Sequence, residues 1–130
     1  MRHRRRGREH GSTSIQIVIL MPVLLAMSFL GLQAALVHHA RSVAVDAATE
    51  GARAAATEFG TEADGVQAAT GFLAQVGDRA LPTSRVTVTR TATAARAEVT
   101  GTALTVLPWW TPRISQHAVA TVERLTVGVP

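Results

Sequence analysis

Few side chains in this 130-residue sequence have the types and spacings that chemistry requires. His38 and His39 are adjacent, so on a helix they point about 100° apart and cannot chelate a metal from one face. Asp46 and Glu50 would share a helix face, but neither a histidine partner nor a pocket accompanies them. We assign no catalytic residue and no metal ligand, and we expect no cofactor.

The sequence also lacks the short motifs that mark common enzyme sites. No GxSxG elbow, phosphate-binding glycine loop, HExxH or calcium-loop pattern occurs. Cysteine is absent, which excludes disulfides, thiol catalysis and the usual zinc sites but is compatible with export in bacteria. We therefore expect a protein that is not an enzyme and has no small-molecule substrate.

The positive charge is concentrated at the N-terminus. The formal net charge is +4, and all thirteen basic residues are arginine. Five of them lie in the first eight positions: Arg2, Arg4, Arg5, Arg6 and Arg8. Beyond residue 40, eight arginines balance eight acidic residues. A nucleic-acid-binding surface needs positive charge spread over the folded domain, so we expect no nucleic-acid partner.

An uncharged stretch follows this basic tip. Residues 15–37 are apolar apart from Gln16, Ser28 and Gln33. As a helix they would be about 34 Å long, against a hydrocarbon core of about 30 Å. Pro22 is tolerated because it lies in the first turns of a membrane helix. The positive-inside rule then places the tip in the cytoplasm and the chain beyond about residue 37 outside.

A cleavable signal peptide is the alternative interpretation of this segment. It would be cut near residues 32–34, but the apolar run exceeds the usual length of roughly 7–15 residues and no small-x-small site follows it cleanly. The arginine triplet also resembles a twin-arginine signal, although the residues after it lack the hydrophobic continuation. A retained membrane helix is therefore favoured.

The helix is expected to continue beyond the membrane, because residues 41–59 are mostly alanine. A ridge of small side chains recurs every four residues: Ala40, Ala44, Ala48, Ala52 and Ala56. Such a ridge lets another helix approach closely, although an alanine-rich composition can produce the same spacing by chance.

The remaining chain predicts a short helix and a small sheet. After Gly60, residues 61–64 resemble a capping box that opens a helix ending at Gly77. Its expected apolar stripe is Val66, Ala69, Leu73 and Val76. Alternating residues predict paired strands at 85–91 and 96–104 and a third strand at 116–125. The expected fold class is α+β: a long N-terminal transmembrane helix continuing into an exported helix, a second short helix, and an antiparallel sheet of about three strands.

Two large aromatic residues, Trp109 and Trp110, lie between prolines in the loop before the third strand. Three locations are open for them: the core, the membrane interface and a contact with a partner subunit.

Most of the chain resembles the TadE-like pilus-assembly proteins, minor pseudopilins of the Flp or tight-adherence pilus system. The resemblance is carried by the basic tip, by GSTSIQIVILMPVLLAM with its early proline, by DAATEGARAAA, and by the LP-containing loop with ATVERL. It implies a bacterial structural subunit that joins or primes an extracellular pilus built by a secretion machine. The implied partners are the membrane, other pilin-like subunits and the pilus-assembly machinery.

The resemblance also implies a role for Gly11, because prepilin peptidases cut after a glycine between a basic leader and a hydrophobic helix. Gly11 and Ser12 occupy that border. The fifth residue after the cut is glutamate in most type IV pilins, whereas here it is Gln16, which can hydrogen-bond but supplies no charge pair. A flexible glycine ahead of a permanent anchor is the alternative.

The expected organisation is therefore a basic cytoplasmic leader at residues 1–11, a transmembrane helix at 12–40, and an exported helix with a small β domain at 41–130. The expected function is structural, in assembly of an Flp-type pilus or a related secretion apparatus. The alternatives are a signal-anchored exported interaction domain unrelated to pili and a secreted inhibitor or ligand-binding domain.

Overall fold

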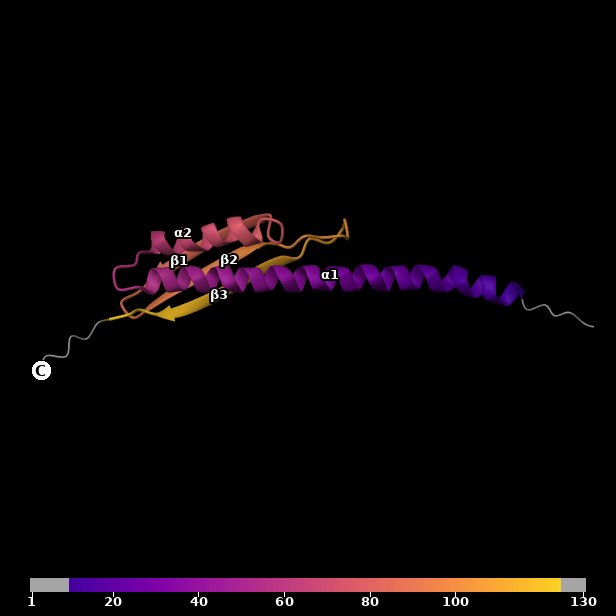
Figure 1. The fold of residues 1–130 in the computed structure, drawn as a ribbon, viewed down its shortest axis with the longest axis horizontal. Coiled ribbons are helices and arrows are strands. Elements are labelled where there is room, and N and C mark those ends of the chain that lie inside the picture. The colour runs from indigo at the N-terminus through magenta and orange to yellow at the C-terminus, as the bar shows by residue number, and fades with distance from the viewer. Residues whose placement is uncertain (1–9, 125–130) are drawn as a thin grey trace, which may run out of the picture. The chain divides into compact units, whose positions relative to one another are not determined.

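The computed structural model describes the backbone of residues 10–124 and the side chains of residues 14–124. Its elements follow in the order α1 (His10–Ala56), α2 (Glu62–Phe72), the π-helical turn η1 (Leu73–Gly77), β1 (Thr83–Arg90), β2 (Ala94–Thr102) and β3 (Arg113–Thr121). The expected α+β fold class is confirmed (Figure 1). The arginine tip at residues 2–8 lies outside the described residues.

The chain divides into two compact units, Met1–Leu32 and Gln33–Pro130, and α1 contributes residues to both. In the first unit, every described side chain from Ser14 to Leu32 is exposed, and Pro22 lies inside the helix. The Ser28 hydroxyl donates to the Leu24 carbonyl at 2.8 Å, so its polar group is satisfied within the helix. This unit presents no buried face of its own among its described side chains.

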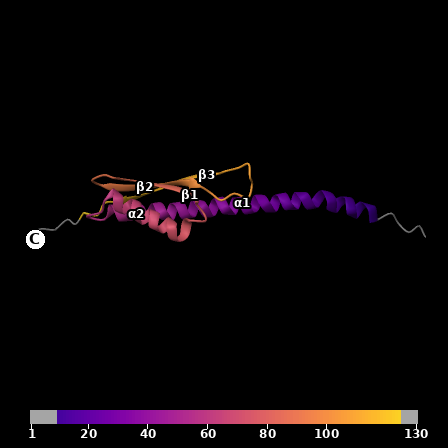
Figure 2. The same cartoon turned by 90° about the horizontal axis from the view of Figure 1, so that it is seen from above.

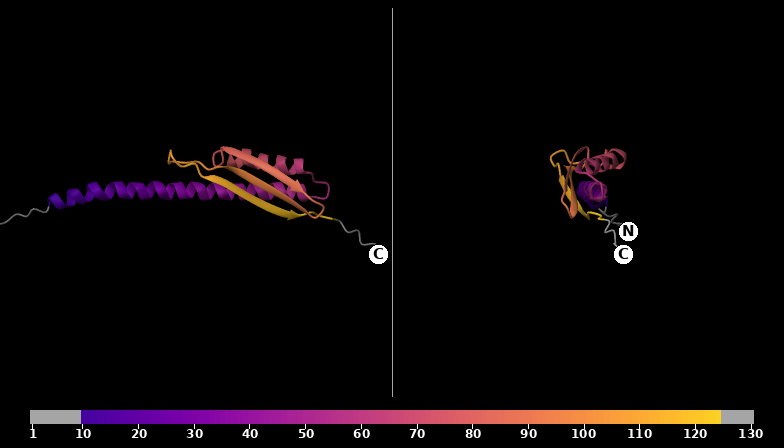
Figure 3. Two further views of the ribbon diagram at one scale, coloured as in Figure 1. Left: turned by 180° about the vertical axis from the view of Figure 1, so that it is seen from behind. Right: turned by 90° about the vertical axis from the view of Figure 1, so that its left-hand side faces the viewer.

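In the second unit, α1 and α2 lie on the same face of the sheet (Figures 2 and 3). One face of α1 is buried at three- and four-residue spacings from Gln33 to Ala56. Its residues are mainly alanine, because small side chains allow a helix to lie close to both a sheet and another helix. The buried members are Gln33, Ala40, Val43, Ala44, Ala47, Ala48, Gly51, Ala52, Ala55 and Ala56.

The sheet is antiparallel with the strand order β1-β2-β3. Val86 pairs with Val99, and Ala97 pairs with Ala118. Since side chains alternate along a strand, Ala97 and Val99 face the helices while Arg96 and the intervening polar residues face away, as the sequence predicts. The third strand begins three residues before its predicted start and ends at Thr121.

The predicted start of α2 is confirmed. Thr61 is its N-cap, and the Asp64 backbone N–H donates to the Thr61 hydroxyl at 3.1 Å while the Thr61 N–H donates to the Asp64 carboxylate at 2.8 Å. This reciprocal pair is a capping box, which satisfies backbone donors that the helix itself leaves unpaired.

The predicted apolar stripe of α2 is only partly correct. Ala69 and Leu73 are buried, but Val66 is 36% exposed and Val76 is 55% exposed. The buried line instead runs through Gly65, Ala69, Leu73 and Gly77. The reason is the close approach of α1: a Cβ atom placed on Gly65 would lie 2.7 Å from the Gly51 carbonyl oxygen. A position with no side chain therefore faces the neighbouring helix.

Candidate functional site

The described residues offer little for chemistry. No group of three or more His, Cys, Asp or Glu residues that could hold a metal ion occurs among them. His38, His39, Asp46 and Glu50 are all exposed on α1.

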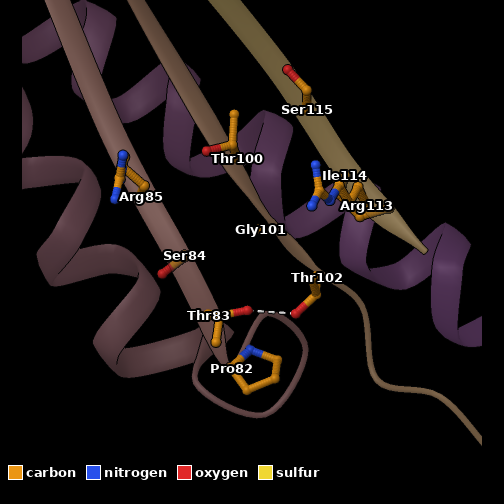
Figure 4. A pocket seen from close by; sticks show the side chains of 10 residues that line it. All are labelled: Pro82, Thr83, Ser84, Arg85, Thr100, Gly101, Thr102, Arg113, Ile114 and Ser115. Carbon is orange, nitrogen blue, oxygen red and sulfur yellow. Dashed lines mark hydrogen bonds between the residues drawn. The ribbon is translucent and has the colours of Figure 1, made fainter. Parts of the chain in front are cut away.

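A depression lies over one end of the sheet (Figure 4). Its polar side chains are hydroxyls and guanidinium groups, including those of Thr100, Arg85 and Arg113. No carboxylate or imidazole lines it, but the lining hydroxyl of Ser115 donates to the carboxylate of Glu98 on β2 at 3.0 Å.

The most apolar surface is the first part of α1. Thirteen large apolar side chains between Ile15 and Leu32 are 44–71% exposed. The most apolar 18-residue window of the helix Ser14–Ala56 has a mean hydropathy of 2.4, and none of that window is buried. The helix is thus long and apolar enough to cross a membrane, and the lack of burial distinguishes it from the core helix of a soluble protein.

The candidate processing residues lie at the start of this helix. Gly11 and Ser12 are helical in the backbone, within the first turn of α1. Gln16 is exposed and lines a shallow groove with Ile15, Ile19, Leu20 and Val23. Gln16 is the polar side chain of this groove, as the sequence indicates. Cleavage after Gly11 stays a prediction.

The alanine ridge lies in the core of the second unit. Its five members, Ala40, Ala44, Ala48, Ala52 and Ala56, are 0–4% exposed. They pack within a cluster that also contains Val88, Val99 and Ile114 from the sheet. The close approach that a small-residue ridge permits is therefore used inside the chain, and in this fold a helix of another subunit cannot reach these side chains.

Gln33 begins the same buried face and is 1% exposed. Its Oε1 atom accepts from the Val106 N–H at 2.9 Å and lies 3.2 Å from the Thr105 hydroxyl, while its Nε2 donates to the Leu104 carbonyl at 3.3 Å. Sequence reasoning treated Gln33 only as a polar interruption of the span. The signal was available, because residues 33, 37, 40 and 44 fall on one helix face.

The loop that Gln33 holds connects β2 to β3. It extends beyond the ends of these strands, alongside α1 of the second unit (Figures 1 and 3). Residues 103–112 include no charged side chain, and Trp109 and Trp110 are 80% and 47% exposed. A core location for both tryptophans is therefore wrong, whereas contact with a membrane or a partner stays open.

Comparison with known families gives a match within the first half of the chain. Residues 11–53 match the family described as TadE-like protein. The matched segment begins at Gly11, includes the exposed apolar part of α1 and ends at Arg53, in the part of α1 that packs against the sheet and α2. The resemblance to TadE-like proteins is confirmed over these residues. No curated protein and no solved structure matches the chain.

Proposed function

We propose that this chain, which is TadE-like over residues 11–53, is a membrane-anchored structural subunit in the assembly of an Flp-type pilus or a related secretion apparatus. The observation that carries the proposal is the coincidence of the family match with the apolar first part of α1, whose described side chains up to Leu32 are all exposed. A role in assembly accounts for a chain whose most distinctive surface is apolar and whose described residues contain no candidate metal cluster.

The anchor has a physical basis in the length and exposure of α1. The 18 residues from Ile15 to Leu32 form a helix of about 27 Å, close to the hydrocarbon thickness of about 30 Å. At the centre of a span, Leu, Ile, Phe and Val each favour insertion by about 0.3–0.6 kcal/mol. The side chains exposed here are mostly of these types, so their combined contribution stabilises a membrane location.

The proposed orientation places the N-terminus in the cytoplasm and the second unit outside, because the arginine cluster precedes the span. The chain has no cysteine, so a Thr83→Cys variant carries a unique thiol at an exposed position. On intact cells with a permeabilised wall, it should react with a membrane-impermeant maleimide. A matched His3→Cys variant, combined with Gly11→Leu so that the leader is retained, should react only after lysis, and the reverse pattern would show the opposite orientation.

Contact with other pilin-like subunits is proposed to use the exposed face of α1 around Gln16. Within a bundle of membrane helices, an exposed amide such as that of Gln16 gains from a hydrogen bond to a neighbouring helix. Such bonds contribute about 0.6–2 kcal/mol, which corresponds to roughly a 3- to 30-fold change in association. Ser28 provides a matched control, since its hydroxyl is already bonded within the helix.

The test uses cells that build such a pilus and lack the gene for this chain. Wild-type protein should restore surface pili and adherence, Ser28→Ala should do the same, and Gln16→Leu should reduce crosslinks to other pilus subunits 3- to 30-fold while still inserting in the membrane. Normal pili and adherence without the gene would refute a role in pilus assembly and favour a membrane-tethered interaction domain.

A further inference from the structure

We propose that the β2–β3 loop, residues 103–112, is a second membrane contact, which inserts Trp109 and Trp110 into the lipid headgroup region beside the point where α1 leaves the bilayer. The proposal rests on the proposed function in one respect, namely that α1 spans a membrane. It adds a lipid-binding surface in the folded unit, remote in sequence from the span.

The position of this loop follows from its contacts with Gln33. Every described side chain before Gln33 is exposed, and Gln33 itself is the first buried residue of α1. A span of Ile15–Leu32 nearly fills the hydrocarbon core, so α1 leaves the core within about one turn of Gln33. Since Leu104, Thr105 and Val106 bond directly to the Gln33 amide, the base of the loop lies at that same level.

The side chains of the loop suit an interface between lipid and water. Leu104, Val106, Trp109 and Trp110 are 37–80% exposed, and no charged residue lies between Ala103 and Pro112. Tryptophan concentrates at bilayer interfaces because its ring is apolar while its indole N–H can bind water or headgroups. Residues of this kind gathered on one exposed loop favour a lipid surface as the occupant.

Part of the backbone of the loop is paired within the protein. The Val106 N–H donates to Gln33, the Leu107 N–H to the Thr105 hydroxyl at 3.1 Å, and the Trp110 N–H to the Leu107 carbonyl at 3.1 Å. The two prolines of the loop have no N–H to satisfy. An unpaired backbone donor costs several kcal/mol in the hydrocarbon core, so this partial pairing suits the headgroup region, where water can bind the N–H groups that remain, such as that of Trp109.

Among the described residues, the opposite end of the unit does not share these features. Phe59 is 87% exposed in the connection between α1 and α2, but it stands beside Glu58 and close in sequence to Glu62. A single aromatic residue flanked by carboxylates is typical of a solvated surface. Phe59 therefore provides a matched position for a control.

The experiment uses the intrinsic fluorescence of the full chain, because it contains two tryptophans, both in this loop, and no tyrosine. The protein is reconstituted at low density in phosphatidylcholine–phosphatidylglycerol vesicles containing phosphatidylcholine brominated at different depths. Emission should be blue-shifted, protected from iodide, and quenched more strongly by bromines near the headgroups than by bromines near the bilayer centre. Iodide quenching without bromolipid quenching would overturn the proposal. Protection from both quenchers would indicate a protein contact and would also overturn it.

Two control variants separate this inference from the proposed function. Both carry Trp109→Phe and Trp110→Phe, and each adds one new tryptophan. Phe29→Trp, within the span, should be protected from iodide and quenched by bromines along the acyl chains, and absence of bromolipid quenching at every depth would refute the membrane anchor itself. Phe59→Trp should respond to iodide alone. If Phe29→Trp is quenched but the native tryptophans behave like Phe59→Trp, the anchor stands and the loop proposal fails.

Discussion

Two glycines set the distance between α1 and α2. A Cβ atom on Gly65 would lie 2.7 Å from the Gly51 carbonyl oxygen and 2.9 Å from a Val88 methyl group. A Cβ on Gly51 would similarly lie 2.9 Å from the Gly65 carbonyl oxygen. Backbone atoms cannot move aside as the end of a flexible side chain can, so both positions exclude a side chain unless the helices separate.

The first prediction compares two glycines of α2. Gly65→Ala should lower the free energy of unfolding by about 1–3 kcal/mol, because overpacking forces the helices apart. Gly71→Ala, where nothing lies within 4 Å of the added atom, should be neutral or stabilising by up to about 1 kcal/mol from helix propensity. Denaturant unfolding of the full chain in detergent, followed by circular dichroism, measures both. Equal effects would contradict the close helix contact.

The second prediction concerns Gln33. Gln33→Leu removes the acceptor of the Val106 N–H and should cost about 1–3 kcal/mol of stability, because a buried donor loses its partner. It should also increase iodide quenching of the loop tryptophans. Gln16→Leu is the matched control, since Gln16 is exposed and belongs to the first unit. An unchanged unfolding curve for Gln33→Leu would show that the loop is not held by this amide.

At the scale of elements, the strands and the start of α2 were readable from sequence because each has a local cause. Alternation identifies Ala97 and Val99 as inward-facing without knowledge of their partners, and the Thr61–Asp64 capping box is a four-residue signal. The buried face of α2 could not be predicted in full. Apolar periodicity selects Val66, and no sequence pattern indicates that Gly65 packs against the backbone of α1. The alanine ridge is evident in the sequence, but the surface that packs against it is not. Composition alone does not distinguish a sheet of the same chain from a helix of another subunit.

The third prediction follows from the capping box of α2. Hydrogen bonds from the Thr61 side chain and backbone hold the pKa of Asp64 below its ordinary value of 3.8. A carboxylate with a lowered folded-state pKa contributes stability that is complete above its unfolded value and is lost as the pH falls through the folded value. The stability difference between wild type and Asp64→Asn should therefore shrink as the pH is lowered below 3.8.

Chemical unfolding of both proteins across this pH range measures that difference. Thr61→Ala is the control, because it removes the largest cause of the lowered pKa. The free energy of unfolding of this variant should vary less with pH over the same range. A difference between wild type and Asp64→Asn that does not vary with pH would contradict a role for the ionised carboxylate.

At the scale of the whole molecule, α1 is one helix with two environments. Its first part exposes apolar side chains on all sides, whereas its second part buries one narrow face from Gln33 onward. The sequence predicts a boundary at residue 40, because no charged residue occurs between residues 11 and 40. Burial of Gln33 and Ala40 depends on a loop and a sheet some seventy residues later, which no local pattern reveals.

The fourth prediction is that any mature form keeps the whole of the exposed helix. A cut after Gly11 removes only the basic leader, whereas a signal-peptidase cut near residues 32–34 would remove the span and disturb the Gln33 contacts that hold the β2–β3 loop. Intact-mass measurement of protein extracted from membranes should show either the full chain or a form beginning at Ser12.

If the form beginning at Ser12 is found, Gly11→Leu should return the mass to that of the uncut variant, because a branched side chain would replace the glycine at the cut. A mature chain beginning at Ala34 or Ala35 would contradict both the anchor and the subunit role, since the product would have lost Ile15–Leu32 and with it the means to reach other subunits within a membrane.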